Sequence, residues 1–164
     1  MAEALRKVGY RGSGAGAERG DGKSVKAEDG AGGGPACPKD IEFRDNGRLR
    51  RELLARDALD WAGALRGVSQ TQLRNFYSEV KSLQARIQND RNGEFENYRA
   101  LVGMLNAKVA YACARANADS KGGFKNLEKM IKRCVYLSQL DESSEAFNDF
   151  ALFFEAVLGF FRGK

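Results

Sequence analysis

The stretch "SQTQLRNFYSEVKSLQARI", residues 69–87, has the apolar spacing of an amphipathic helix. Its large apolar side chains recur three or four residues apart, which places them on one face of a helix with 3.6 residues per turn. Ser69 stands before the first turn and Gln72 follows three positions later, which is the S-x-x-Q pattern of a capping box. We therefore predict a helix that begins after Ser69 and ends near Asn89. Its inward stripe is Leu73, Phe76, Tyr77, Val80, Leu83, Gln84 and Ile87.

The helical period extends over the rest of the chain from Arg48 onward. This part has no proline and little of the alternation expected of strands. Turn-forming residues separate the periodic segments, as in "NDRNGE" (89–94) and "NADSKGG" (117–123). We therefore expect an all-α fold, a compact antiparallel bundle of five or six helices formed by residues 48–164. The predicted helices are 48–65, 70–89, 95–105, 107–117, 124–137 and 141 to the C-terminus, with Asn106 interrupting or bending the chain between the third and the fourth.

The first and last predicted helices carry the most distinctive core residues. In the first, the inward positions are Leu49, Leu53, Ala58, Trp61, Ala62 and Leu65. In the last, the core stripe is Phe147, Phe150, Phe154, Val157, Leu158 and Phe161. Leu152, Phe153 and Phe160 widen the apolar arc of that helix past half its circumference. Such a helix is either central in the bundle or packs its edge against another subunit, and both can hold.

The first 47 residues differ in composition from the rest. Ten of the 19 glycines lie between residues 9 and 34, and both prolines follow closely. Large apolar side chains are few, so burial cannot offset the entropy lost on ordering this segment. We expect a disordered Gly-rich tail over residues 1–47, in which only Pro35–Arg44 packs locally. The tail lacks the apolar core of a secretory signal, and no stretch of the chain could span a membrane.

Composition also limits the chemistry. The chain has no histidine, which is the usual general base near neutral pH and the commonest metal ligand. This excludes Ser-His-Asp and Cys-His catalysis, and no glycine motif for phosphates or dinucleotides is present. We therefore expect a protein that is not an enzyme and uses no cofactor or metal. A nuclease built on carboxylates alone stays open as an alternative.

The three cysteines are Cys37, Cys113 and Cys134, an odd number at wide spacing. This is no disulfide framework, so a reducing cytoplasm is the expected location. Cys113 falls on a face of small side chains within "MLNAKVAYACAR" (104–115), where a buried inert thiol is expected. The other members of that face are Val109, Ala112 and Ala116.

Charge divides along the chain. Residues 1–47 carry 8 Lys/Arg and 8 Asp/Glu, so the net charge of +5 falls on residues 48–164. A basic excess favours an anionic partner such as nucleic acid. In "MLNAKVAYACAR", the side chains of Lys108, Tyr111 and Arg115 form a stripe beside the small-residue face. The stripe is either a solvated flank or a cation–aromatic–cation strip for a phosphate backbone.

Two other predicted helices carry basic stripes. Arg74 and Lys81 are seven residues apart and share a face of the second helix. Lys125, Lys129 and Lys132 lie on one side of the fifth, with Arg133 beside them. Like charges at this spacing repel one another, so either the face is well solvated or an anionic partner offsets the repulsion.

Four segments, taken in order, resemble one family. They are "TQLRNFYSEVKSLQ" (71–84), "LVGMLNAKVAYACAR" (101–115), "FKNLEKMIKRC" (124–134) and "FNDFALFFEAVLGFFRG" (147–163). Together they resemble the small subunit of the type III-A CRISPR effector, the Csm complex, over residues 68–164. The Gly-rich tail and the helix predicted over Arg48–Leu65 lie outside this resemblance.

The resemblance implies a non-catalytic, all-α subunit that stacks in several copies as a minor filament. Its implied partners are copies of itself, the backbone and large Csm subunits, and the CRISPR RNA with its target RNA. RNA contacts carried over from the matching motifs fall on Arg74, Lys108, Tyr111 and Arg115. The helical stripes add Lys81, Lys125, Lys129, Lys132 and Arg133 as weaker RNA-binding candidates. The alternative is a helical adaptor between proteins that touches no nucleic acid.

Overall fold

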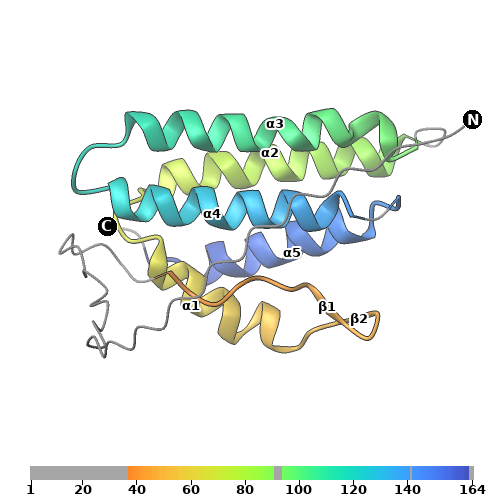
Figure 1. The fold of residues 1–164 in the computed structure, drawn as a ribbon, viewed down its shortest axis with the longest axis horizontal. Helices are drawn as coiled ribbons and strands as arrows, with labels where there is room; N and C mark the ends of the chain where they lie inside the picture. Colours follow the sequence, from red (N-terminus) through yellow and green to blue (C-terminus); the bar gives the residue numbers. More distant parts are fainter. Residues whose placement is uncertain (1–36, 91–93, 141, 163–164) are drawn as a thin grey trace, which may run out of the picture. The chain divides into compact units, whose positions relative to one another are not determined.

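The computed structural model describes residues 37–90, 94–140 and 142–162 of the chain. Within these ranges the fold is all-α, as predicted, with five α-helices and one very short hairpin (Figure 1). The elements are β1 (Arg44–Asp45), β2 (Arg48–Leu49), the 3-10 turn η1 (Glu52–Leu54), α1 (Arg56–Ala64), α2 (Gln70–Asn89), α3 (Glu96–Arg115), α4 (Lys121–Ser138) and α5 (Glu145–Phe160).

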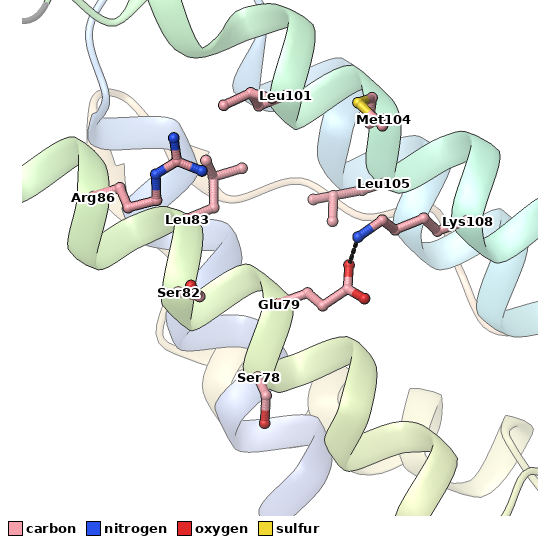
Figure 2. A pocket seen from close by; sticks show the side chains of 9 residues that line it. All are labelled: Ser78, Glu79, Ser82, Leu83, Arg86, Leu101, Met104, Leu105 and Lys108. Atoms are coloured by element: carbon pink, nitrogen blue, oxygen red, sulfur yellow. Dashed lines mark hydrogen bonds and ion pairs between the residues drawn. The ribbon is translucent and has the colours of Figure 1, made fainter.

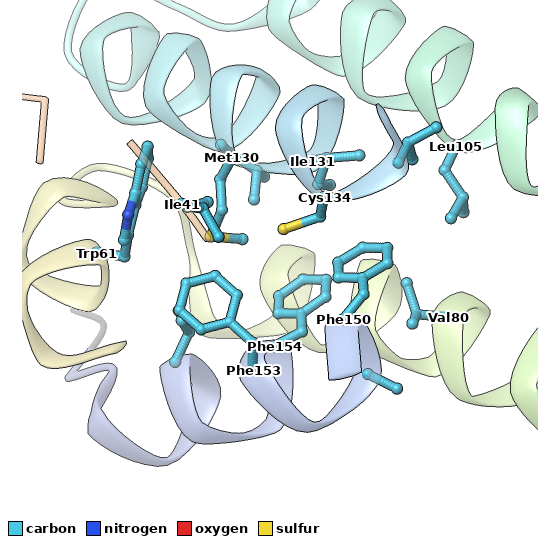
Figure 3. Close-up of a cluster of buried hydrophobic side chains, with 14 of the residues drawn as sticks. Ile41, Trp61, Val80, Leu105, Met130, Ile131, Cys134, Phe150, Phe153 and Phe154 are labelled. Carbon is cyan, nitrogen blue, oxygen red and sulfur yellow. The ribbon is translucent and has the colours of Figure 1, made fainter. Parts of the chain in front are cut away.

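Helix α5 lies at the centre of the described part of the chain. It contacts α1, α2, α4 and η1, whereas α3 packs chiefly on α4. The four rings of Phe147, Phe150, Phe153 and Phe154 are fully buried. Figure 3 shows three of these rings in one cluster with Trp61. The wide apolar arc of α5 is thus explained, because α1, α2, α4 and η1 together cover most of its sides.

The capping box of α2 forms as predicted. The backbone N–H of Gln72 donates to Ser69 Oγ at 3.2 Å, and the N–H of Ser69 donates to Gln72 Oε1 at 3.0 Å. Gln84, the polar member of the α2 stripe, is buried and donates to Asn148 Oδ1 of α5 at 2.9 Å. The one polar residue in the α2 stripe therefore serves to hydrogen-bond α2 to α5.

The predicted break at Asn106 is wrong, because α3 runs unbroken through it. Asparagine is only a modest helix former, costing about 0.7 kcal/mol relative to alanine. The buried side chains of Val102, Leu105 and Val109 on either side hold the helix against the core. Tertiary packing therefore overrides the local preference at this position.

The first predicted helix is wrong over its N-terminal part. Residues 48 and 49 form β2, which pairs antiparallel with β1 across a two-residue turn. The turn residues Asn46 and Gly47 have φ of 48° and 77°, the left-handed conformation that Asn-Gly hairpin turns adopt. The helix begins only at Arg56. The predicted core positions after the turn, Leu53, Ala58, Trp61, Ala62 and Leu65, are buried, and Leu49 is half-buried.

Residues 37–49, here called the N-terminal strap, pack on the bundle. Ile41 and Phe43 are only 2% and 5% exposed and belong to the core. The local packing expected of Pro35–Arg44 is therefore confirmed over residues 37–44, because these two apolar side chains suffice to anchor a short segment. Residues 45–47, which were expected to be disordered, instead belong to the β1–β2 hairpin. The expectation for residues 1–36 falls outside the described part of the chain.

Side chains of α4 and α5 hold the strap in place. Arg133 of α4 donates from Nε to the carbonyl of Ile41 at 3.0 Å. Arg44 donates from Nε to Asp149 Oδ2 at 2.5 Å and from Nη1 to Glu145 Oε2 at 2.8 Å, both on α5. Asp149 is buried, so its charge depends on this pair for compensation.

A close backbone approach joins the start of α4 to the turn after α1. A Cβ built on Gly123 would lie 2.2 Å from the carbonyl oxygen of Arg66. Gly67, in the same turn, has φ of 95°. Asn126 of α4 donates to the Ala64 carbonyl at 3.0 Å, which satisfies the end of α1. Only glycine leaves room for the contact at position 123.

We expect Gly123→Ala to lower the free energy of unfolding by about 2 kcal/mol or more, because backbone must move to admit the methyl group. Urea unfolding of the full chain measures this. Gly159→Ala on α5 is the matched control, since nothing lies within 4 Å of its added Cβ. The control should be neutral or stabilising by about 0.5–1 kcal/mol. Equal effects of the two substitutions would contradict the close approach.

We expect Phe43→Ala to lower the free energy of unfolding by about 3 kcal/mol, since it removes a buried aromatic ring. The same urea experiment serves, with Phe160→Ala as the control because that ring is 42% exposed. A loss for Phe43→Ala no larger than that of the control would mean that the strap is not part of the core.

Candidate nucleic-acid interface

The stripe on α3 is exposed and internally ordered. Tyr111 is 63% exposed. Arg115 Nη1 donates to Tyr111 Oη at 2.8 Å, and its guanidinium carbon lies 5.4 Å from the ring centroid. Lys108 lies on the same face, three residues before Tyr111. The structure therefore brings these three side chains together, as the spacing predicts. They form a cation–aromatic–cation surface, here called the α3 strip.

Lys108 is held by α2. Its ammonium pairs with the carboxylate of Glu79, and both side chains are nearly half exposed. Exposed ion pairs contribute little to stability. A phosphate that replaced Glu79 as the partner of Lys108 would therefore disturb the fold only slightly.

The predicted pair on α2 lies on another side of that helix. Lys81 Nζ is 3.8 Å from Glu155 Oε2 of α5, whereas Glu79 turns toward α3. Arg74 is exposed and shares the face of Lys81, from which it is seven residues distant. The structure thus places Arg74 and Lys81 at the α2–α5 edge and not beside the α3 strip.

The basic residues of α4 line its exposed face on the side of the strap. Lys125, Lys129 and Lys132 are exposed, and Lys129 Nζ lies 3.5 Å from Cys37 Sγ of the strap. Arg133 is engaged by the strap, since its Nε lies 3.2 Å from Asp40 Oδ1 and bonds the Ile41 carbonyl. The nine predicted residues therefore fall on three separate surfaces.

Sequence reasoning missed Tyr136, which continues the row formed by Lys125, Lys129 and Lys132. These four residues are here called the α4 stripe. Tyr136 is 55% exposed, four residues after Lys132, and the Arg133 guanidinium carbon lies 5.6 Å from its ring centroid. A tyrosine stacked with arginine therefore occurs on both α3 and α4. Extending the helical stripe from Lys132 by one turn would have found it.

The buried cysteines are poor nucleophiles. Burial raises the pKa of Cys113, and the neighbouring carboxylate of Glu128 raises it further. Burial raises the pKa of Cys134 well above its usual value. Both thiols are therefore protonated at neutral pH, which agrees with the expectation for Cys113. Among the described residues no group of three or more Cys, Asp or Glu side chains could hold a metal ion.

Glu128 links this region to the α4 stripe. The hydrogen bond from Lys132, at 2.6 Å, is the main cause that lowers the pKa of Glu128, and the Cys113 thiol adds to it. Burial acts in the opposite direction. Lys132 is thus already paired within its own helix.

The fold and these surfaces define a small all-helical protein with basic, partly aromatic strips on exposed helix faces. In the described ranges, none of its helices combines the length and apolar character needed to cross a membrane. The family model described as Csm2 Type III-A matches residues 48–163. The chain therefore belongs to the Csm2 family, the small subunit of the type III-A CRISPR Csm complex. No curated protein and no solved structure matches it.

The family match confirms the resemblance and corrects its extent. It includes the segment from Arg48 to Leu65, which the motifs had left outside. Residues 37–47 of the strap precede the matched range, although Ile41 and Phe43 are part of the core. The core of this chain thus uses side chains that the family match does not cover.

We expect Lys132→Ala to lower the free energy of unfolding at neutral pH and to have no effect in strong acid. The pKa of Glu128 is depressed in the folded chain, so its contribution is present above the ordinary value of 4.5 and is lost as pH falls through the folded pKa. Urea unfolding from about pH 7 down to about pH 2 measures the difference. Lys125→Ala, on the same face, is the control and should show no such pH dependence. A Lys132→Ala effect that is the same at both ends of this range would contradict the assigned pair.

Proposed function

We propose that the chain is a non-catalytic Csm subunit that stacks in several copies and contacts the backbone of guide or target RNA without reading its sequence. The observation that carries the proposal is the α3 strip, in a chain of the Csm2 family. The strip exposes two cations around a tyrosine and leaves their common face open to a partner. Lysine and arginine bind phosphates, and an exposed tyrosine adds stacking or a hydrogen bond.

Polyelectrolyte physics explains why such a subunit works in copies. Each cation that neutralises a phosphate releases counterions, with a slope of about −0.7 per contact for single strands. A few contacts on one subunit bind weakly at physiological salt. Identical subunits in a stack place these weak sites side by side. Once one subunit holds the RNA, the next subunit meets it at a high effective concentration, so the affinity of the stack exceeds that of one subunit.

The α4 stripe is a second candidate contact in this proposal. Lys125, Lys129 and Tyr136 are exposed, and Lys132 would have to exchange Glu128 for a phosphate. Arg133 is better regarded as an anchor of the strap, because two strap residues already bond it. Arg74 and Lys81 remain candidates at the α2–α5 edge.

A protein–protein adaptor without nucleic-acid contact is the second candidate function. Leu152 and Phe160 on the outer side of α5 are 44% and 42% exposed, which favours some contact with another protein. Most of the phenylalanine rings of α5 point inward, however, so the apolar area left for a partner is modest.

We expect Lys108→Ala/Arg115→Ala in the assembled complex to weaken RNA binding and to reduce the salt slope by roughly 0.7 for each lost contact. Fluorescence anisotropy with single-stranded RNA at several salt concentrations measures both quantities. Arg51→Ala/Arg56→Ala is the matched control, since both arginines are exposed and lie outside the strips. An unchanged affinity and slope for the α3 variant would favour the adaptor. RNA cleavage by the pure subunit, abolished by one Asp or Glu change, would contradict a non-catalytic role.

A further inference from the structure

A groove of about 400 Å³ lies between α2 and α3, next to the α3 strip. Figure 2 shows its lining, which comes from one face of each helix. The lining residues are Ser78, Glu79, Ser82, Leu83, Arg86, Leu101, Met104, Leu105 and Lys108.

The floor of the groove is apolar, and an apolar side chain at its rim is exposed to solvent. Leu83 and Leu105 are buried beneath it, and Leu101 is half-buried. Met104 at the rim is 52% exposed. Methionine is polarisable and adapts its shape, and it makes favourable contacts with the edges and faces of aromatic rings. The surface therefore suits a flat aromatic group.

Charged groups stand at both ends of the groove. Figure 2 shows Leu83 and Leu105 lying between Arg86 and the Lys108–Glu79 pair. Glu79 and Arg86 are seven residues apart on α2, so the groove is about 10 Å long. Two cations and one carboxylate line it, which leaves a net positive charge.

We propose that this groove receives one unpaired nucleobase of an RNA strand whose phosphates lie along the α3 strip. The inference rests on the proposed function, because Lys108 belongs both to the strip and to the groove. The base would lie on the leucine floor, between Met104 and the guanidinium plane of Arg86. RNA-binding proteins commonly stack unpaired bases on arginine planes and aromatic rings. The Ser82 hydroxyl and the Glu79 carboxylate are the groups available to the polar edge of the base.

The ends of the groove favour a base over the helix of a protein partner. A helix that docks by residues spaced along one face needs a groove that continues past its anchors. Here it would have to cross Arg86 or the Lys108–Glu79 pair and desolvate their charges, which is costly. A single base fits between the charges and leaves them in contact with water and with the adjoining phosphates.

Two variants of the full chain test the proposal against two strands. The strands are a 15-nucleotide oligouridylate and an abasic strand of the same length and backbone. Met104→Ala removes the exposed wall, and Ser82→Phe fills the groove. Each should weaken oligouridylate binding about fivefold or more, as expected for the loss of one stacked base, and leave abasic binding unchanged. Leu152→Ala, on α5, is the control for loss of an exposed apolar side chain.

The outcomes separate this inference from the function on which it rests. Arg115→Ala, at a strip residue that does not line the groove, should weaken both strands equally if the strip binds phosphates, whatever the groove does. Unchanged oligouridylate affinity in Met104→Ala and Ser82→Phe would overturn the base site and leave the strip intact. Absence of binding of either strand by the unaltered chain at low salt, where phosphate contacts are strongest, would overturn both. Loss of co-purification with other Csm subunits in Met104→Ala, with RNA binding unchanged, would assign the groove to a protein and overturn the proposal.

Discussion

The structure depends on the need to cover α5 on nearly every side. Its four fully buried phenylalanine rings present more apolar surface than one neighbouring helix can shield. Helices α1, α2 and α4 and the turn η1 supply the cover. Because α3 packs chiefly on α4 and only lightly on α2, the α3 strip stays exposed and a groove is left between α2 and α3.

The elements that sequence alone could predict are those whose signal is local. The S-x-x-Q cap and the apolar stripe fixed α2 correctly, because both the cap and the period act within one helix. The Asn46–Gly47 turn was overlooked although Asn-Gly is a strong hairpin signal, since the apolar positions beyond it also fit a helix. For the strap, the sequence indicated only that Pro35–Arg44 packs locally. It could not indicate the partners, because Arg133, which bonds the Ile41 carbonyl, lies 92 positions away in the chain.

The candidate site was predictable in the same limited way. Spacing along α3 placed Lys108, Tyr111 and Arg115 on one face, since helical geometry alone decides this. It could not reveal that Glu79 meets Lys108, or that strap residues engage Arg133, because those partners come from other elements. The groove is likewise formed jointly by residues of α2 and α3, and no pattern within either helix encodes it.

The bond from Arg44 to Asp149 joins residues 105 positions apart. Together with the contacts of α5, it means that this core cannot close until α5 has left the ribosome. Helices α1 to α4, made first, would meanwhile expose the surfaces intended for α5, which is the condition that invites aggregation or chaperone binding. Local helices form quickly, whereas contacts between residues far apart in the chain close slowly, so we expect the contact between Arg44 and Asp149 to form late.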